Sequence, residues 1–92
     1  MPPACRLAGN QLEDKGTIVI CNALSESKAS KLQELDLQRN DITIKGAESV
    51  AAYLAVTASL TALDVRDNRL GNKGEALLQQ AVQGRSEFDL KM

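Results

Sequence analysis

A block of leucines and one asparagine occurs twice in this chain at a fixed interval. The stretch LQELDLQRNDI at 32–42 returns 28 residues later as LTALDVRDNRL at 60–70. A weaker copy surrounds Asn10, and a partial copy without the asparagine begins at Glu87. Such a period is typical of a solenoid, in which each unit buries its apolar side against its neighbour. We therefore predict a stack of similar units, whose extended surface suits binding better than catalysis.

Each unit changes its hydrophobic period halfway. Leu35 and Leu37 alternate with polar residues, as in a strand with one buried face. After Asn40, the residues Gly46, Val50 and Leu54 follow at the four-residue spacing of one helix face. We predict strand–helix units at about 4–31, 32–59 and 60–84 and a terminal strand at 86–91, all in one domain, 1–92. The first unit has two extra residues, which we place in a polar loop at 25–31.

Local signals predict how the three helices begin and end. Asn72 with Glu75 three residues later predicts a capping box for the third helix, and Gly84 its end. Asp14 is expected to cap the first helix and Thr43 the second.

The recurring asparagines and glycines have structural interpretations. An amide side chain has both a donor and an acceptor, so the asparagines can bond to the backbone of their own turn and of neighbouring units. The glycines at the helix starts are expected to allow stacked units to approach closely, at positions 16, 46 and 74. Cys5 and Cys21 are expected to be small buried hydrophobic residues.

The pattern L-x-x-L-x-L-x-x-N-x-L, with a helix in a 28-residue period, resembles the leucine-rich repeats of the ribonuclease-inhibitor type. The resemblance covers about residues 5–91. The first unit departs from it with Pro2 and Cys5 at leucine positions, and the last lacks the leading leucine and the asparagine. The resemblance implies an α/β solenoid, a right-handed β-α superhelix with a parallel sheet on its concave face and helices on its convex face.

Composition excludes several kinds of function. A net charge of −1 gives no general attraction for nucleic acid. No apolar run approaches the roughly 18 residues of a membrane helix, and the first residues do not resemble a signal peptide, so an intracellular, cytoplasmic protein is expected. The chain has no histidine, and the common zinc sites and histidine-based catalysis are therefore excluded. We predict no metal, no cofactor and no enzymatic activity.

The polar residues between the core leucines are predicted to face the concave surface in columns. One column is expected to hold Arg6, Asp36, Asp64 and Asp89. Its neighbours are expected to hold Ala8, Gln38, Arg66 and Lys91 on one side, and Ala4, Glu34, Ala62 and Glu87 on the other. The candidate partner-binding residues are Glu34, Asp36, Gln38, Asp64, Arg66, Asp89 and Lys91. The alternative is that aspartate is common at this position in such repeats and only solvates the face.

The leading functional hypothesis is a protein–protein interaction module or scaffold that binds through the concave strand face. The resemblance also permits a regulator of another enzyme, ribonuclease-inhibitor-like or GTPase-activating-like, the latter through exposed Arg39 or Arg69. A fragment of a longer repeat array is a further alternative. One lysine per unit, at positions 15, 45 and 73, could meet an acidic partner. Both ends of the stack lack polar capping repeats, so we also expect cover by more protein or self-association through strand edges.

Overall fold

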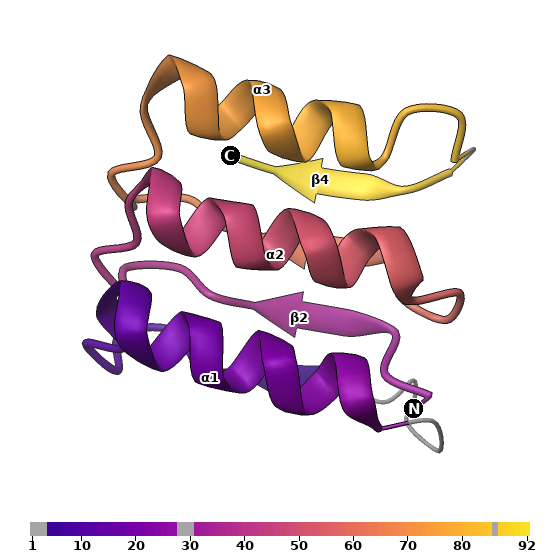
Figure 1. Ribbon diagram of the computed structural model, residues 1–92, viewed down its shortest axis with the longest axis horizontal. Coiled ribbons are helices and arrows are strands. Elements are labelled where there is room, and N and C mark those ends of the chain that lie inside the picture. The colour runs from indigo at the N-terminus through magenta and orange to yellow at the C-terminus, as the bar shows by residue number, and fades with distance from the viewer. Residues whose placement is uncertain (1–3, 28–30, 86) are drawn as a thin grey trace.

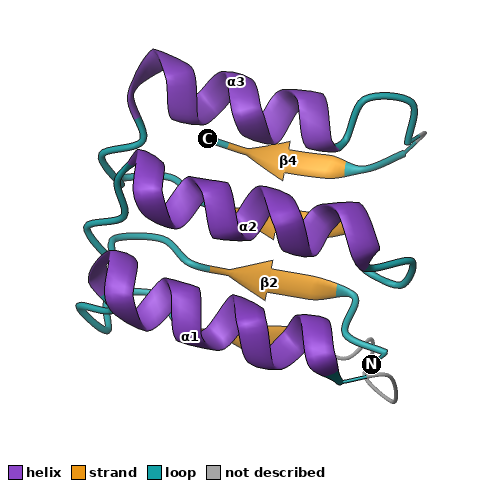
Figure 2. Cartoon of the chain, in the orientation of Figure 1, coloured by secondary structure: helices purple, strands orange, loops and turns teal. Residues whose placement is uncertain are grey.

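A computed structural model describes residues 4–27, 31–85 and 87–92. The chain alternates strands and helices (Figures 1 and 2): β1 (Ala4–Arg6), α1 (Glu13–Glu26), β2 (Glu34–Asp36), α2 (Ile44–Val56), β3 (Ala62–Asp64), α3 (Gly71–Ala81) and β4 (Asp89–Lys91). The predicted loop at 25–31 starts later than expected, because α1 continues to Glu26. Residues 28–30 of that loop, Ser86 of the predicted terminal strand and residues 1–3 lie outside the described part of the chain.

The four strands form one parallel sheet in the order β1-β2-β3-β4, and the three helices stack in a separate layer (Figure 1). Between the layers lies the core. In the two inner units, the apolar residues that alternate along the chain are at most 2% exposed: Leu35, Leu37, Leu63 and Val65. Ile42, Val50 and Leu54 of the second unit and Leu78 of the third join them, and Leu7 and Leu90 pack against this core while partly buried. The two-residue strand period and the four-residue helix period therefore meet in one apolar layer, and the predicted solenoid is confirmed.

The register of β4 differs from the predicted one. Leu90 pairs with Leu63, so Asp89 lies beside Ala62 and Lys91 beside Asp64. The predicted alignment instead puts Asp89 beside Asp64, so the predicted and observed registers differ by two residues. The observed pairing keeps 27 residues between Leu63 and Leu90, close to the 28 between Leu35 and Leu63. The helix and its connections need this length, whereas the expected alignment left a unit three residues shorter than the one before.

Asparagine side chains join each turn to the turn of the preceding unit. Asn40 is fully buried, and its Oδ1 accepts hydrogen bonds from the N–H groups of Asn10 (2.9 Å) and Leu12 (3.2 Å). Its Nδ2 donates to the carbonyls of Leu7 (2.8 Å) and Gln38 (3.1 Å). The same pattern recurs 28 residues later, at Asn68. The predicted structural role is thus confirmed for these two asparagines, while Asn10 is exposed and has no such bond within the described ranges.

Two of the predicted helix caps are wrong. α3 begins at Gly71 after Leu70, which is already helical in backbone conformation, so Asn72 lies inside the first turn and caps nothing. Gly84 lies three residues beyond the end of α3, in a turn with φ of 85°. Thr43 does cap α2, accepting from the N–H of Lys45 (3.4 Å). Asp14 lies within α1 and does not cap it.

The Asp14 carboxylate instead caps the helix of the next unit. It accepts from the N–H groups of Thr43 (2.7 Å) and Gly46 (2.9 Å) and from the Thr43 hydroxyl. Partial burial raises the pKa of Asp14, but these hydrogen bonds and the nearby charge of Lys45 outweigh it and hold the pKa below its usual range. A carboxylate at a helix start also interacts favourably with the helix dipole.

The predicted close approach at the glycines is found where α2 meets the unit before it. A Cβ on Gly46 would lie 2.5 Å from Ile42 Cγ2 and 2.7 Å from Asp14 Oδ1. A Cβ on Gly74 would come within 3.5 Å of the Ala47 side chain. For a Cβ on Gly16, the three nearest atoms would all belong to Leu12 of the same unit, with the closest at 3.1 Å. The need for glycine is therefore greatest at position 46.

One arginine in the connection between α3 and β4 forms hydrogen bonds with backbone carbonyls before β3. The Arg85 guanidinium donates to the carbonyls of Leu54 (3.2 Å) and Leu60 (2.7 Å). Its central carbon lies 5.0 Å from the centre of the Phe88 ring, within the range of a cation–π interaction. β4 and β1 are the edges of the described sheet. Pairing of these edges with another chain stays a prediction.

Candidate functional site

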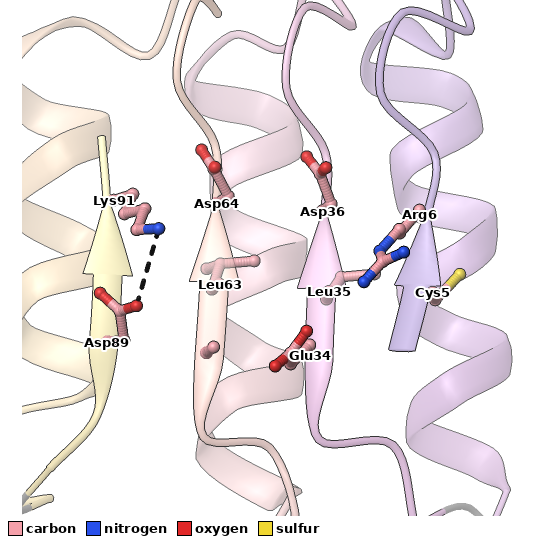
Figure 3. A pocket seen from close by; sticks show the side chains of 10 residues that line it. Cys5, Arg6, Glu34, Leu35, Asp36, Leu63, Asp64, Asp89 and Lys91 are labelled. Carbon is pink, nitrogen blue, oxygen red and sulfur yellow. Dashed lines mark ion pairs between the residues drawn. The ribbon is translucent and has the colours of Figure 1, made fainter. Parts of the chain in front are cut away.

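A row of charged side chains crosses the concave face of the sheet. The pairing register aligns Arg6 on β1 with Asp36 on β2, Asp36 with Asp64 on β3, and Asp64 with Lys91 on β4. Figure 3 shows the Arg6 guanidinium extending toward β2, with Asp36 and Asp64 side by side. We call these four residues the concave row. Because side chains alternate along a strand, the leucines between them point into the core while the row faces outward.

A second set of residues lies beside the concave row. Each is two residues earlier on its strand than a member of the row and therefore lies on the same face of the sheet. The second set consists of Ala4, Glu34, Ala62 and Asp89. The charged members of both sets line one shallow hollow of about 160 Å³. Four carboxylates and two cations surround this hollow, so its net charge is negative (Figure 3).

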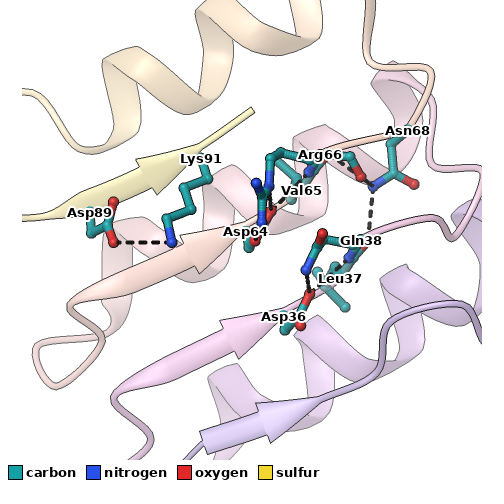
Figure 4. A network of polar contacts seen from close by, with 9 residues as sticks. All are labelled: Asp36, Leu37, Gln38, Asp64, Val65, Arg66, Asn68, Asp89 and Lys91. Carbon is teal, nitrogen blue, oxygen red and sulfur yellow. Dashed lines mark hydrogen bonds and ion pairs between the residues drawn. The ribbon is translucent and has the colours of Figure 1, made fainter.

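The two central aspartates are held in different ways (Figure 4). Asp64 accepts from the backbone N–H of Arg66 (3.1 Å) and from its guanidinium, with an Nη2–Oδ2 distance of 2.8 Å. Partial burial raises the pKa of Asp64, but the hydrogen bonds from Arg66 and the charges of Arg66 and Lys91 hold it below its usual range. Asp36 accepts from the N–H and the side-chain amide of Gln38 (3.1 and 3.0 Å), which are neutral donors. Among the described residues, no cation forms an ion pair with Asp36.

The structure brings together most of the predicted site residues. Glu34, Asp36, Asp64, Asp89 and Lys91 line the hollow, whereas Gln38 and Arg66 fold back onto the aspartates of their own strands. Three column assignments are wrong, because the observed register puts Asp89 beside Ala62, where Glu87 was predicted, and puts Lys91 beside Asp64.

Sequence reasoning placed Arg6 in the column but left it out of the candidate residues. The β1 register confirms its predicted place beside Asp36, at one end of the concave row. The two aspartates accept hydrogen bonds from backbone N–H groups just beyond their own strands, so they also help to shape the strand ends. The alternative that they only solvate the face stays a prediction.

Other parts of the surface offer less chemistry. In the described ranges, no cluster of acidic or cysteine side chains is arranged to hold a metal ion. Burial raises the pKa of the Cys21 thiol to about 12, so it is a core residue and not a nucleophile, while Cys5 is half-buried. None of the helices in those ranges has the length and apolar character needed to cross a bilayer. The three lysines at the helix starts are exposed, and their role stays a prediction.

Comparison with known proteins agrees with this architecture. The family model described as leucine-rich repeat matches residues 28–51 and 58–74. RAN GTPase-activating protein 2 of Arabidopsis thaliana is 43% identical over 68% of this chain, which spans 11% of that protein. Human NACHT, LRR and PYD domains-containing protein 5 is 40% identical over 83% of the chain, spanning 6% of that protein. Mouse ribonuclease inhibitor is 36% identical over 78%, spanning 16%.

The chain thus spans a small part of the length of each of these relatives. Repeat domains of this kind generally bind other proteins and are typically not catalytic, because their stacked units present an extended surface without an enclosed pocket. The period, the parallel sheet, the asparagine-bonded turns and the matches agree with one another. The chain therefore belongs to the leucine-rich-repeat family, in its ribonuclease-inhibitor-like form.

Proposed function

We propose that this chain binds a protein partner through its concave strand face. The observation that carries the proposal is the shallow hollow lined by the concave row and by Glu34 and Asp89. The side chains project from a sheet whose backbone is fixed by hydrogen bonds on both sides at β2 and β3, so little ordering is needed on binding. The negative balance of the hollow favours lysine or arginine side chains of the partner.

The expected affinity is moderate and dependent on salt. No aromatic residue lines the hollow, and high-affinity interfaces usually depend on buried aromatic or arginine anchors. Exposed charges contribute mainly to the rate of association and to selectivity, and both effects weaken as ionic strength rises. Binding should accordingly decline when salt is added.

A pair of matched variants tests the proposal. A partner captured by the intact chain would be purified and titrated against Glu34→Gln/Asp36→Asn, which removes two concave charges while keeping an oxygen acceptor for Gln38. The control is Glu48→Gln/Glu75→Gln, which changes the net charge equally on helices α2 and α3. We expect the concave variant to weaken binding about tenfold and the control to have little effect. Equal affinities for both variants would contradict binding through the concave face.

Regulation of another enzyme is the second candidate function. Two of the similar proteins are named as a GTPase-activating protein and a ribonuclease inhibitor. Arg39 is exposed and forms no ion pair within the described ranges, whereas Arg69 is paired with Asp41 at 2.9 Å. An arginine that inserts into a GTPase must be free to move, which favours Arg39. GTP hydrolysis by Ran should be stimulated by the intact chain and not by Arg39→Ala, while Arg69→Ala should retain most of the stimulation. Absence of stimulation by the intact chain would remove the GTPase-activating form of this candidate.

A further inference from the structure

The charges of the concave row follow a fixed order across the sheet. Arg6 and Lys91 lie at its two ends, and Asp36 and Asp64 lie between them, one residue on each strand. Parallel strands are about 4.8 Å apart, so the row extends over roughly 14 Å in three nearly equal steps. A ligand that matches all four charges needs the reverse order, acid–base–base–acid, at the same spacing.

Three of the four charges are available to a ligand. Arg6 is exposed and makes no ion pair with another described residue. Among the residues that the structure describes, the Asp36 carboxylate accepts hydrogen bonds only from the neutral Gln38. The Lys91 ammonium lies 3.9 Å from Asp89 with both side chains more than half exposed, and such a pair is weak and easily exchanged. Asp64 is partly neutralised by Arg66, so the strongest contact for a cation is at Asp36.

The spacing of the row distinguishes a helical ligand from an extended one. In an α-helix, residues i, i+3, i+7 and i+10 lie on one face at about 0, 4.5, 10.5 and 15 Å along the axis. Each falls within about 1 Å of the strand positions, at roughly 0, 4.8, 9.6 and 14.4 Å. In an extended peptide, same-face residues are about 6.7 Å apart, so the fourth would lie roughly 6 Å beyond its strand. Flexible side chains can absorb the first mismatch but not the second.

We propose that the concave row binds an α-helix that lies across the strands and carries an acid–base–base–acid stripe at i, i+3, i+7 and i+10. The proposal rests on the proposed function and specifies its partner. The acids of the stripe pair with Arg6 and Lys91, and its bases pair with Asp36 and Asp64. The stripe has the same order and spacing in both directions, so the helix can lie either way along the row.

Three labelled peptides test the inference, and the first two have identical composition. The matched peptide has glutamates at i and i+10 and lysines at i+3 and i+7 in an alanine-rich helix. The permuted peptide exchanges the glutamates and lysines, and the third peptide is the matched one with a central proline that breaks the helix. Fluorescence anisotropy gives the Kd of each, and circular dichroism establishes helicity. Because exposed ion pairs are individually weak, we expect the matched peptide to bind about tenfold more tightly than the others.

Variants of the protein test the order of charges separately. Arg6→Glu/Lys91→Glu makes the row uniformly acidic, and the preference for the matched over the permuted peptide should disappear. Lys15→Glu/Lys73→Glu changes the net charge equally on α1 and α3 and should keep the preference.

Three results would overturn the inference: equal binding of matched and permuted peptides, undiminished binding of the proline peptide, or no binding at all. Matched and permuted peptides could bind equally well, and Glu34→Gln/Asp36→Asn could still weaken the binding of both. This result would overturn the inference but leave the concave face as the binding surface. If that variant leaves both peptide binding and partner binding unchanged, the proposed function fails as well.

Discussion

Replacement of Asn40 by alanine should be among the most destabilising polar substitutions in this chain. The side chain is fully buried and makes four hydrogen bonds to backbone groups of two adjacent turns. One of these groups, the Gln38 carbonyl, keeps a bond from the N–H of Gly9 at 2.9 Å. The Leu7 carbonyl and the N–H groups of Asn10 and Leu12 have no other bond among the described residues.

The size of the effect follows from these three groups. Each buried polar group without a partner costs about 1–3 kcal/mol, which sums to roughly 3–9 kcal/mol. The turn that contains Asn10 lies at the surface, so water can replace part of the loss, and we expect about 3–5 kcal/mol. Domains of this size have a total stability of only about 5–15 kcal/mol. The variant should therefore be partly unfolded, or close to it.

Urea denaturation followed by far-UV circular dichroism measures this difference, and Asn10→Ala is the internal control. Asn10 occupies the same motif position but is exposed, so its replacement should change the free energy of unfolding by less than about 0.5 kcal/mol. Asn40→Asp keeps the shape and the acceptor but turns an ionised carboxylate toward two carbonyls, and should be at least as harmful as alanine at neutral pH. If Asn40→Ala and Asn10→Ala cost the same, the role assigned to the buried amide is wrong.

Three further substitutions test how the units are joined. Gly46→Ala should destabilise the protein by about 1–3 kcal/mol, because the added methyl group overlaps Ile42 and Asp14, whereas Gly16→Ala should change stability by less than about 1 kcal/mol in the same urea assay. The lowered pKa of Asp14 stabilises the fold above the ordinary aspartate pKa, and this contribution is lost as pH falls through the folded-state value. Asp14→Asn should thus lower stability at neutral pH and flatten its acid dependence, and an unchanged acid dependence would refute the role of the carboxylate. Arg85→Ala should cost about 1–3 kcal/mol by removing two bonds to backbone carbonyls, with faster amide exchange in β4 than in the unsubstituted protein; unchanged exchange in β4 would show that Arg85 does not hold this strand.

The sequence predicts the repeating part of this fold well, because equivalent residues in different repeats predict the same structural position. Leu35 and Leu63 identify the buried strand positions independently, and the structure pairs them directly. Where the repeat is incomplete, this agreement is missing. Phe88 and Leu90 alternate like a core pair, and period-two alternation is unchanged by a shift of two residues. The register of β4, and with it the place of Asp89 and Lys91, depends on the length of the connection and not on the pattern.

Capping by Asp14 could not be predicted for a different reason. Rules for helix ends compare a residue with its immediate sequence neighbours, and Thr43 is 29 residues away. The fold brings the two together because α1 packs directly against α2. The candidate site shows the same limit at one position. The repeat predicts Arg6, Asp36 and Asp64 in this order, but only the register of β4 places Lys91 beside Asp64.

The exchange of side chains between units also bears on the order in which the chain can acquire structure. The first unit supplies Asp14 to the helix start of the second, and the second supplies Asn40 to the turn of the first. Neither unit satisfies its own backbone alone, and the turn of the second unit depends in the same way on Asn68 of the third, so neighbouring units must come together for each turn to be completed. During synthesis, the first turn stays incomplete until the segment around Asn40 leaves the ribosome, and a nascent chain stalled before that point should remain sensitive to protease.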